Sequence, residues 1–172
     1  GRVSVAGRDV VREAAAVRAY VGMMGHAPGV YDDLTAAENL RFAVRMMGRV
    51  VEEERIVEAL AAVGLAAEAG ERVRGFSAGM RRRLVLARLR LQRPDVLLLD
   101  EPYASFDAEG VELLNAFVRE TVERGGAALV ATHDLARGEG VLGRALVLDA
   151  GRLVEGAPVA GRPAAGREAV VP

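Results

Sequence analysis

The sequence contains no cysteine and no lysine, so its 23 Lys and Arg side chains are all arginines. Without cysteine, the chain cannot form disulfides, zinc–thiolate sites or a thiol nucleophile. Without lysine, it cannot contain the GxxxxGK loop that binds phosphate in many nucleotide-binding proteins. No apolar run approaches the roughly 20 residues that a membrane-spanning helix needs.

The composition is that of an ordinary globular protein. Hydrophobic residues make up 51% and charged residues 27%, and the formal net charge is -1. No overall field therefore favours nucleic acid or an anionic membrane as the partner. A chain of 172 residues fits one domain, with room for a small inserted lobe. The sequence begins with Gly1 instead of methionine, and we expect it to be a fragment of a longer protein.

Two acids follow a short apolar run near the middle of the chain. The run 96–99 reads VLLL and is followed by Asp100 and Glu101. Apolar side chains at every position predict a strand of a parallel sheet that is covered on both faces. Ligands of open α/β sheets bind beyond the carboxyl ends of the strands, so the two acids indicate a site. On these residues alone, a strand that simply ends in solvated acids is an equal alternative.

Both histidines follow predicted strands. The apolar run 127–131 ends in Thr132-His133-Asp134, and a strand predicted at 18–24 runs into the loop 25–29, which contains His26. The glycines and the proline of that loop exclude regular structure.

Helices are predicted from caps and apolar spacing. Thr35 to Glu38 matches a capping box, and Ser77 and Asp107 suit helix N-caps. Two of the helices lie between the early strands and Ser77 with no strand between them, which predicts a helical lobe inserted into an α/β core. The predicted helices are 35–48, 52–63, 77–93, 107–124 and a short one at 135–141, with hairpins at 1–10 and 144–156 and a flexible tail at 157–172.

Four motifs occur in a fixed order along the chain: FSAGM at 76–80, VLLLD at 96–100, SFD at 105–107 and THD at 132–134. Together they resemble the nucleotide-binding subunit of ABC transporters. The resemblance implies an α/β fold of the P-loop NTPase (RecA-like) type, an ABC ATPase core with a helical subdomain inserted at about 32–93. Residues 1–156 would form a partial domain. Family members place the Walker A strand, loop and helix before the first hairpin strand, so we expect this sequence to lack them.

The resemblance also implies roles for individual residues. Asp100 would hold Mg²⁺ through water, Glu101 would polarise the attacking water, and His133 would hydrogen-bond the γ-phosphate of ATP. His26 occupies the position where most members carry the glutamine of the Q-loop. The signature motif would bind the nucleotide of a second protomer through Ser77, Ala78, Gly79 and Met80. The D-loop, which is Ser105, Phe106 and Asp107, would lie beside the signature motif. The signature departs from the common LSGGQ at Phe76, Ala78 and Met80.

The function implied is that of the ATP-binding and hydrolysing subunit of an ABC-type membrane exporter. Its partners would be a second ATPase subunit, as a homodimer or a pair, and an integral-membrane permease that docks at the Q-loop and the helical subdomain. The protein would lie peripherally at the cytoplasmic face of the membrane. The string GHAPGVYDDLT together with FSAGM is similar to the ATPases that export haem for cytochrome c maturation. Without Walker A, we expect the chain alone to bind MgATP weakly or not at all.

Two alternatives stay open from the sequence. One is a non-catalytic relative that keeps the fold as an interaction module. The other is a nucleic-acid-associated ABC-type ATPase, which the arginines of 81–93 superficially support. Charged residues on a helix usually form a solvated face, and the net charge is not basic, so no nucleic acid is expected as a partner.

Overall fold

The computed structural model describes residues 1–155. Residues 1–133 form one compact unit, and a second unit begins at Asp134. The tail predicted at 157–172 lies outside the described residues. No helix within the described part of the chain combines the length and the hydropathy needed to cross a membrane.

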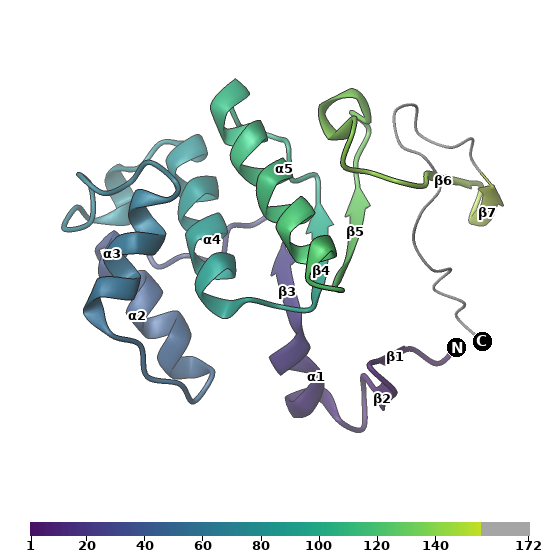
Figure 1. Ribbon diagram of the computed structural model, residues 1–172, viewed down its shortest axis with the longest axis horizontal. Helices are drawn as coiled ribbons and strands as arrows, with labels where there is room; N and C mark the ends of the chain where they lie inside the picture. The colour runs from purple at the N-terminus through teal and green to yellow at the C-terminus, as the bar shows by residue number, and fades with distance from the viewer. Residues whose placement is uncertain (156–172) are drawn as a thin grey trace. The chain divides into compact units, whose positions relative to one another are not determined.

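The first unit is built on a three-stranded parallel sheet. Its strands are β3 (Val21–Met24), β4 (Val96–Asp100) and β5 (Ala127–Ala131), in the order β3-β4-β5 (Figure 1). Met24 is in register with Leu99, and Leu99 with Val130. Because the strands are parallel, their three carboxyl ends lie along the same edge of the sheet.

The two faces of this sheet are covered differently. Met24, Leu97 and Leu99 are buried on one face, where the long helices α4 (Ala78–Gln92) and α5 (Ala108–Glu123) pack. On the other face Met23 is 59% and Leu129 is 64% exposed. The prediction that the strand 96–99 is covered on both faces is therefore wrong for the described residues, because the packed helices protect only one face of the sheet.

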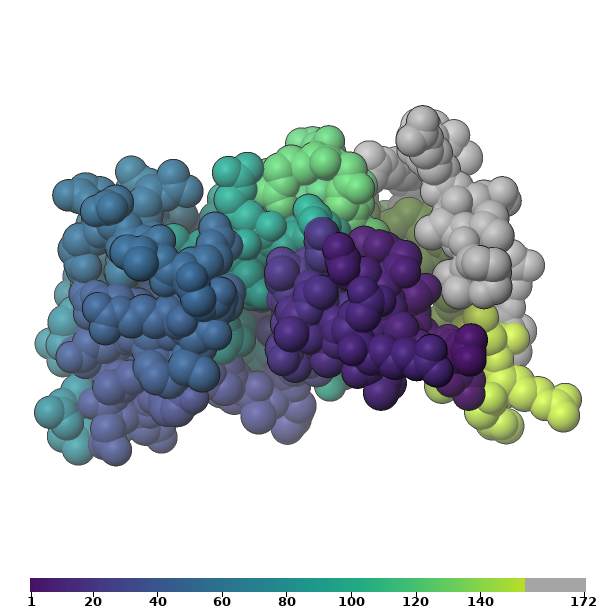
Figure 2. All heavy atoms as spheres, turned by 90° about the horizontal axis from the view of Figure 1, so that it is seen from below, coloured from purple at the N-terminus to yellow at the C-terminus, as the bar shows by residue number. Residues whose placement is uncertain are grey.

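A helical lobe lies between β3 and α4 in the sequence, as predicted. It consists of α2 (Ala36–Met46) and α3 (Glu53–Ala61), which pack against each other and against α4. The predicted capping box is present at Thr35, whose Oγ1 accepts from the Glu38 amide at 3.2 Å, while Glu38 Oε2 accepts from the Thr35 amide at 2.8 Å. A 3₁₀ turn, η1 (Val73–Gly75), leads into α4. Figure 2 shows the lobe, in blue, to the left of the N-terminal residues, in purple.

The N-terminal residues form the predicted hairpin, with β1 (Ser4–Val5) antiparallel to β2 (Arg8–Asp9). A helix, α1 (Ala14–Tyr20), then leads directly into β3. The strand predicted at 18–24 therefore begins three residues later than expected. The reason is the alanine run 14–16, which starts a helix that continues through Tyr20, because alanine is the strongest helix former.

The second unit begins with a single 3₁₀ turn, η2 (Ala136–Gly138), in place of the helix predicted at 135–141. Gly140 follows with a φ of +78°, which is incompatible with a continuing helix. The predicted hairpin is present as β6 (Leu146–Asp149) antiparallel to β7 (Arg152–Glu155).

Candidate functional site

A carboxylate and a histidine meet where β4 and β5 end. The Nδ1 atom of His133 lies 2.9 Å from Oε1 of Glu101, and the backbone amide of His133 donates to the same oxygen at 3.2 Å. The Thr132 hydroxyl lies 3.4 Å from the other carboxylate oxygen. The Glu101 amide donates to the carbonyl of Ala131 at 2.8 Å, which joins the two strand ends. The structure thus brings together two predicted site residues that are 32 positions apart.

The Glu101 carboxylate is kept ionised by these neighbours. The side-chain hydrogen bond with His133 is the largest cause that holds the pKa of Glu101 below its ordinary value, and the charge and the backbone amide of His133 act in the same direction. The side chain of His133 is 85% exposed and that of Glu101 is 35% exposed. The pair is therefore open to a ligand approaching from the edge of the sheet.

The backbone turns sharply at Glu101, which has a φ of +44°. A residue with a side chain costs on the order of 1–3 kcal/mol in such a conformation, and residues of this kind concentrate at functional sites. The unusual turn places the carboxylate beside the end of β5, although Glu101 follows β4.

Asp100 is the last residue of β4 and is exposed at the same edge. Among residues 1–155 no group of three His, Cys, Asp or Glu side chains could hold a metal ion by itself. A single exposed carboxylate fits Mg²⁺, which keeps part of its water shell and takes its remaining ligands from phosphate oxygens. The residues present therefore fit a magnesium ion that binds together with a phosphate ligand.

The signature segment begins α4. Ser77 is the N-cap of this helix, and its Oγ accepts from the Met80 amide at 3.2 Å. Ser77 and Ala78 are exposed, and Gly79 and Met80 are partly so. A Cβ on Gly79 would lie 3.0 Å from the carbonyl oxygen of Ser105, so a glycine here allows the D-loop to approach closely. The segment is an accessible helix N-terminus of the kind that binds anions.

The predicted D-loop is fixed between α4 and α5. Ser105 has a φ of +65°, and Phe106 is buried. Asp107 is the N-cap of α5: its Oδ1 accepts from the Gly110 amide at 2.8 Å and from Nη2 of Arg83 at 2.8 Å. The Gly110 amide and then Arg83 hold the pKa of Asp107 below its ordinary value. The signature and the D-loop thus form one surface of the same unit.

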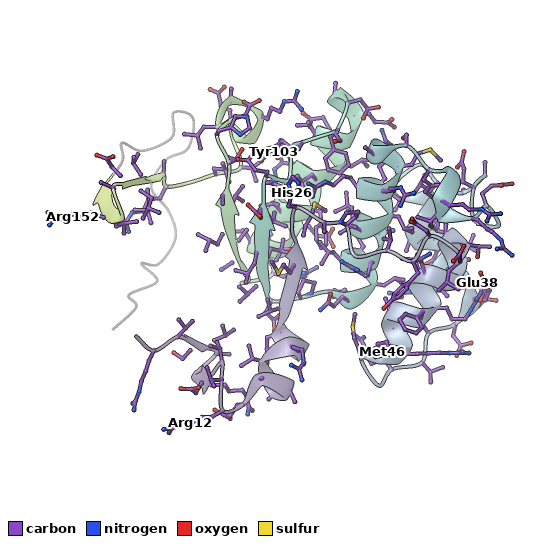
Figure 3. All side chains as sticks on the ribbon, turned by 180° about the vertical axis from the view of Figure 1, so that it is seen from behind. Arg12, His26, Glu38, Met46, Tyr103 and Arg152 are labelled. Atoms are coloured by element: carbon purple, nitrogen blue, oxygen red, sulfur yellow. The ribbon has the colours of Figure 1, made fainter. Side chains whose placement is uncertain are left out.

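His26 lies in the loop that follows β3 (Figure 3), and it is exposed. The carbonyls of Gly25 and Gly29 on either side accept from Arg82 and Arg88, each at 2.9 Å. The interpretation of the α4 arginines as a solvated face is wrong for Arg82, which is only 7% exposed. These two contacts were missed from the sequence, which carries no signal that joins an arginine to a loop carbonyl more than 50 residues away.

Residues 1–104 match the family described as ABC transporter, and the chain belongs to this family. Two solved structures share its fold. The structure of an ATP-binding subunit of an ABC transporter matches with a TM-score of 0.77 and 24% identity, over 88% of this chain and 65% of that one. A dimeric ATP-binding cassette in a post-hydrolysis state, bound to ADP and Pi, matches with a TM-score of 0.71 and 21% identity, over 80% and 65%. The predicted fold class, a P-loop NTPase-like ABC ATPase core, is confirmed.

Several curated relatives are named cytochrome c biogenesis ATP-binding export protein CcmA. The protein from Xanthomonas campestris pv. campestris is 44% identical over 131 residues, which are 76% of this chain and 61% of the relative. The protein from Methylococcus capsulatus is 38% identical over 133 residues, 77% and 64% of the two chains. The chain therefore spans about three fifths of the length of these relatives.

Proposed function

We propose that the full-length protein is the ATP-binding and hydrolysing subunit of an ABC-type membrane exporter. The observation that carries the proposal is the Glu101–His133 pair, held at 2.9 Å beside Asp100 at the carboxyl edge of the sheet. Membership of the ABC transporter family supports it. In a protein that merely kept the fold for binding, nothing would require an ionised carboxylate, a histidine and a second carboxylate at one edge.

Each of the three residues has a role that its surroundings suit. Asp100 would hold Mg²⁺, which when bound screens the charge of the phosphates. Glu101 would accept a hydrogen bond from the attacking water and orient it, because its carboxylate stays ionised and accessible. His133 would donate to the terminal phosphate from its exposed ring while its Nδ1 side stays on Glu101.

The signature segment would serve a second subunit. The exposed N-terminus of α4, from Ser77 through Ala78, Gly79 and Met80, offers backbone amides and a helix dipole to a phosphate. The D-loop, Ser105 to Asp107, lies beside it; the exposed Ser105 and Asp107 would face the same interface, and the buried Phe106 would anchor the loop. One of the structural neighbours is a dimer, which supports pairing with a second ATPase subunit, either a copy of this chain or a related one.

The phosphate-binding loop of such an enzyme needs a lysine, and these 172 residues have none. The lysine would therefore come from residues outside this sequence. The 172-residue chain by itself is expected to bind MgATP weakly or not at all. Titration calorimetry with MgATP tests this expectation, and a micromolar dissociation constant would contradict it.

The names of the curated relatives point to export in cytochrome c biogenesis, and we extend this to haem as the transported group. The protein would lie peripherally at the cytoplasmic face of the membrane, bound to an integral-membrane permease. The permease would dock at the loop 25–29 and the helical lobe. This lobe exposes apolar side chains, among them Phe42, Met46 and Val50.

A complementation experiment tests this assignment. A strain that lacks the gene should lose its c-type cytochromes, seen as loss of haem-stained c-type cytochrome bands. The full-length wild-type gene should restore them, and the Glu101→Gln gene, expressed to the same level, should not. Normal cytochromes c in the deletion strain would overturn the role in cytochrome c biogenesis. Restoration by Glu101→Gln would overturn the requirement for hydrolysis.

The contacts of the α4 arginines argue against a nucleic-acid ATPase. Arg81 pairs with Asp32, Arg82 donates to a loop carbonyl, and Arg83 binds two carboxylates. These guanidinium groups are engaged within the chain and do not form a surface that a phosphate backbone could follow.

A further inference from the structure

Side chains of the signature helix α4 bind the backbone of the segment that runs from β3 into the following loop. The three donors lie along the last three turns of the helix, and the three acceptors lie along the segment. Gln92 Nε2 donates to the carbonyl of Val21, Arg82 Nη1 to that of Gly25, and Arg88 Nη1 to that of Gly29, each at 2.9 Å.

Burying the guanidinium groups of Arg82 and Arg88 costs free energy, but the hydrogen bonds that they then make are strong. Arg82 is 7% exposed and Arg88 is half-buried. Burial lowers the pKa of both guanidinium groups, although the negative charge of Asp100 opposes this for Arg82. A buried guanidinium must find acceptors, and a hydrogen bond from a charged donor is about twice as strong as a neutral one. The carbonyls of the loop are therefore held firmly by α4.

The loop itself is shaped for these contacts. Gly29 has a φ of +59°, in the left-handed region that favours glycine, and in this conformation its carbonyl accepts from Arg88. Beyond it, the buried Asn39 of α2 accepts from the Tyr31 amide at 2.7 Å and donates to the Tyr31 carbonyl at 3.0 Å. The loop is thus fixed at 25, 29 and 31, and the exposed His26 lies between the first two of these points.

We propose that Arg82 and Arg88 are positioning residues that tie the His26 loop to the signature segment of the same subunit. Ser77 to Met80 form the start of α4, and Arg82 follows less than two turns later on the same helix. Coupling between two sites can be carried by a rigid helix and the hydrogen bonds that join it to its neighbours. A movement of the loop, where we place the permease contact, therefore moves the segment that we place on the nucleotide of the second subunit. This inference rests on the proposed function.

The first test asks whether the arginines hold the loop, and it needs no nucleotide. In the full-length protein, Arg82→Met and Arg88→Met should raise the hydrogen-exchange rates of the loop amides, residues 25–31, by about tenfold or more. Arg90→Met is the matched control, because Arg90 lies on the same helix but pairs with Glu120 of α5 at 3.3 Å. Because Arg88 is less buried than Arg82, the Arg88→Met protein can still be measured if Arg82→Met fails to fold. Exchange rates equal to those of the control would overturn the proposal.

The second test separates positioning from general destabilisation. Arg88→Met should lower kcat for ATP hydrolysis about tenfold with little change in KM, and Arg88→Lys should restore part of it. In a His26→Ala background the same substitution should change kcat less than about twofold, because coupled residues are not additive. Equal effects in both backgrounds would overturn the positioning role. A full-length protein without any ATPase activity would refute the proposed function instead, and the exchange experiment would then decide this inference by itself.

Discussion

Asp107 provides a direct test of how the D-loop is fixed, because two interactions converge on its carboxylate. Its Oδ1 accepts from the Gly110 amide at 2.8 Å and caps α5. The loss of such a cap costs about 1 kcal/mol of unfolding free energy. The ion pair with Arg83 adds at most about 1 kcal/mol, because the Asp107 side chain is 68% exposed. Asp107→Ala should therefore lower the unfolding free energy by about 1–2 kcal/mol.

Urea unfolding of the wild type, Asp107→Ala and Asp107→Asn distinguishes the two contributions. Asparagine caps helices as well as aspartate does, so Asp107→Asn should lose only the ion-pair part and remain within about 1 kcal/mol of the wild type. Glu109→Ala is the matched control, since it removes the other carboxylate that binds Arg83, at 2.9 Å, and leaves the cap in place. If Asp107→Asn costs as much as Asp107→Ala, the cap does not hold the D-loop and the reasoning fails.

Two further predictions concern the fold. Gly22→Ala places a Cβ 2.6 Å from Cγ of Pro94, which follows α4, and 2.8 Å from Cδ2 of Leu89 in α4. Such overpacking should lower the thermal midpoint and cost about 1–3 kcal/mol; an unchanged midpoint would show that β3 packs more loosely against these residues than described. Hydrogen bonds from the backbone and side chain of Thr35 hold the pKa of Glu38 below its ordinary value. The stabilisation by this carboxylate is therefore present above the ordinary pKa of about 4 and is lost as the pH falls through the lower, folded-state pKa. Glu38→Gln should reduce the loss of stability between about pH 5 and pH 2, measured by urea unfolding, and an identical acid profile would contradict this.

Features that depend on neighbouring residues could be predicted from the sequence. The N-caps Thr35, Ser77 and Asp107 all accept from the amides expected of them, because the amide that donates to a cap lies only three residues after it. The placement of Glu101 and His133 at one edge of the sheet also follows from the sequence, since each follows a predicted strand and parallel strands end at a common edge.

Features that depend on packing could not be predicted. An apolar run such as 96–99 does not reveal which face of its strand a helix covers. The exposure of Leu129 in the neighbouring strand β5 likewise depends on which face of the sheet the helices cover. The burial of Arg82 depends on a carbonyl 57 residues away, at Gly25, which charge patterning along the helix does not reveal. The start of β3 depends on where α1 ends, and the alanine run extends α1 through residues whose apolar pattern also suits a strand.

The central claim is that Glu101 and His133 act together in ATP hydrolysis. The most direct measurement is the steady-state ATPase rate of the full-length protein with Glu101→Gln and with His133→Ala. A matched control is Glu120→Gln, which removes an exposed carboxylate that pairs with Arg90 and Arg124. The account predicts that both site variants lose at least about 100-fold in kcat while Glu120→Gln keeps the wild-type rate. A Glu101→Gln protein that hydrolyses ATP at the wild-type rate would contradict it.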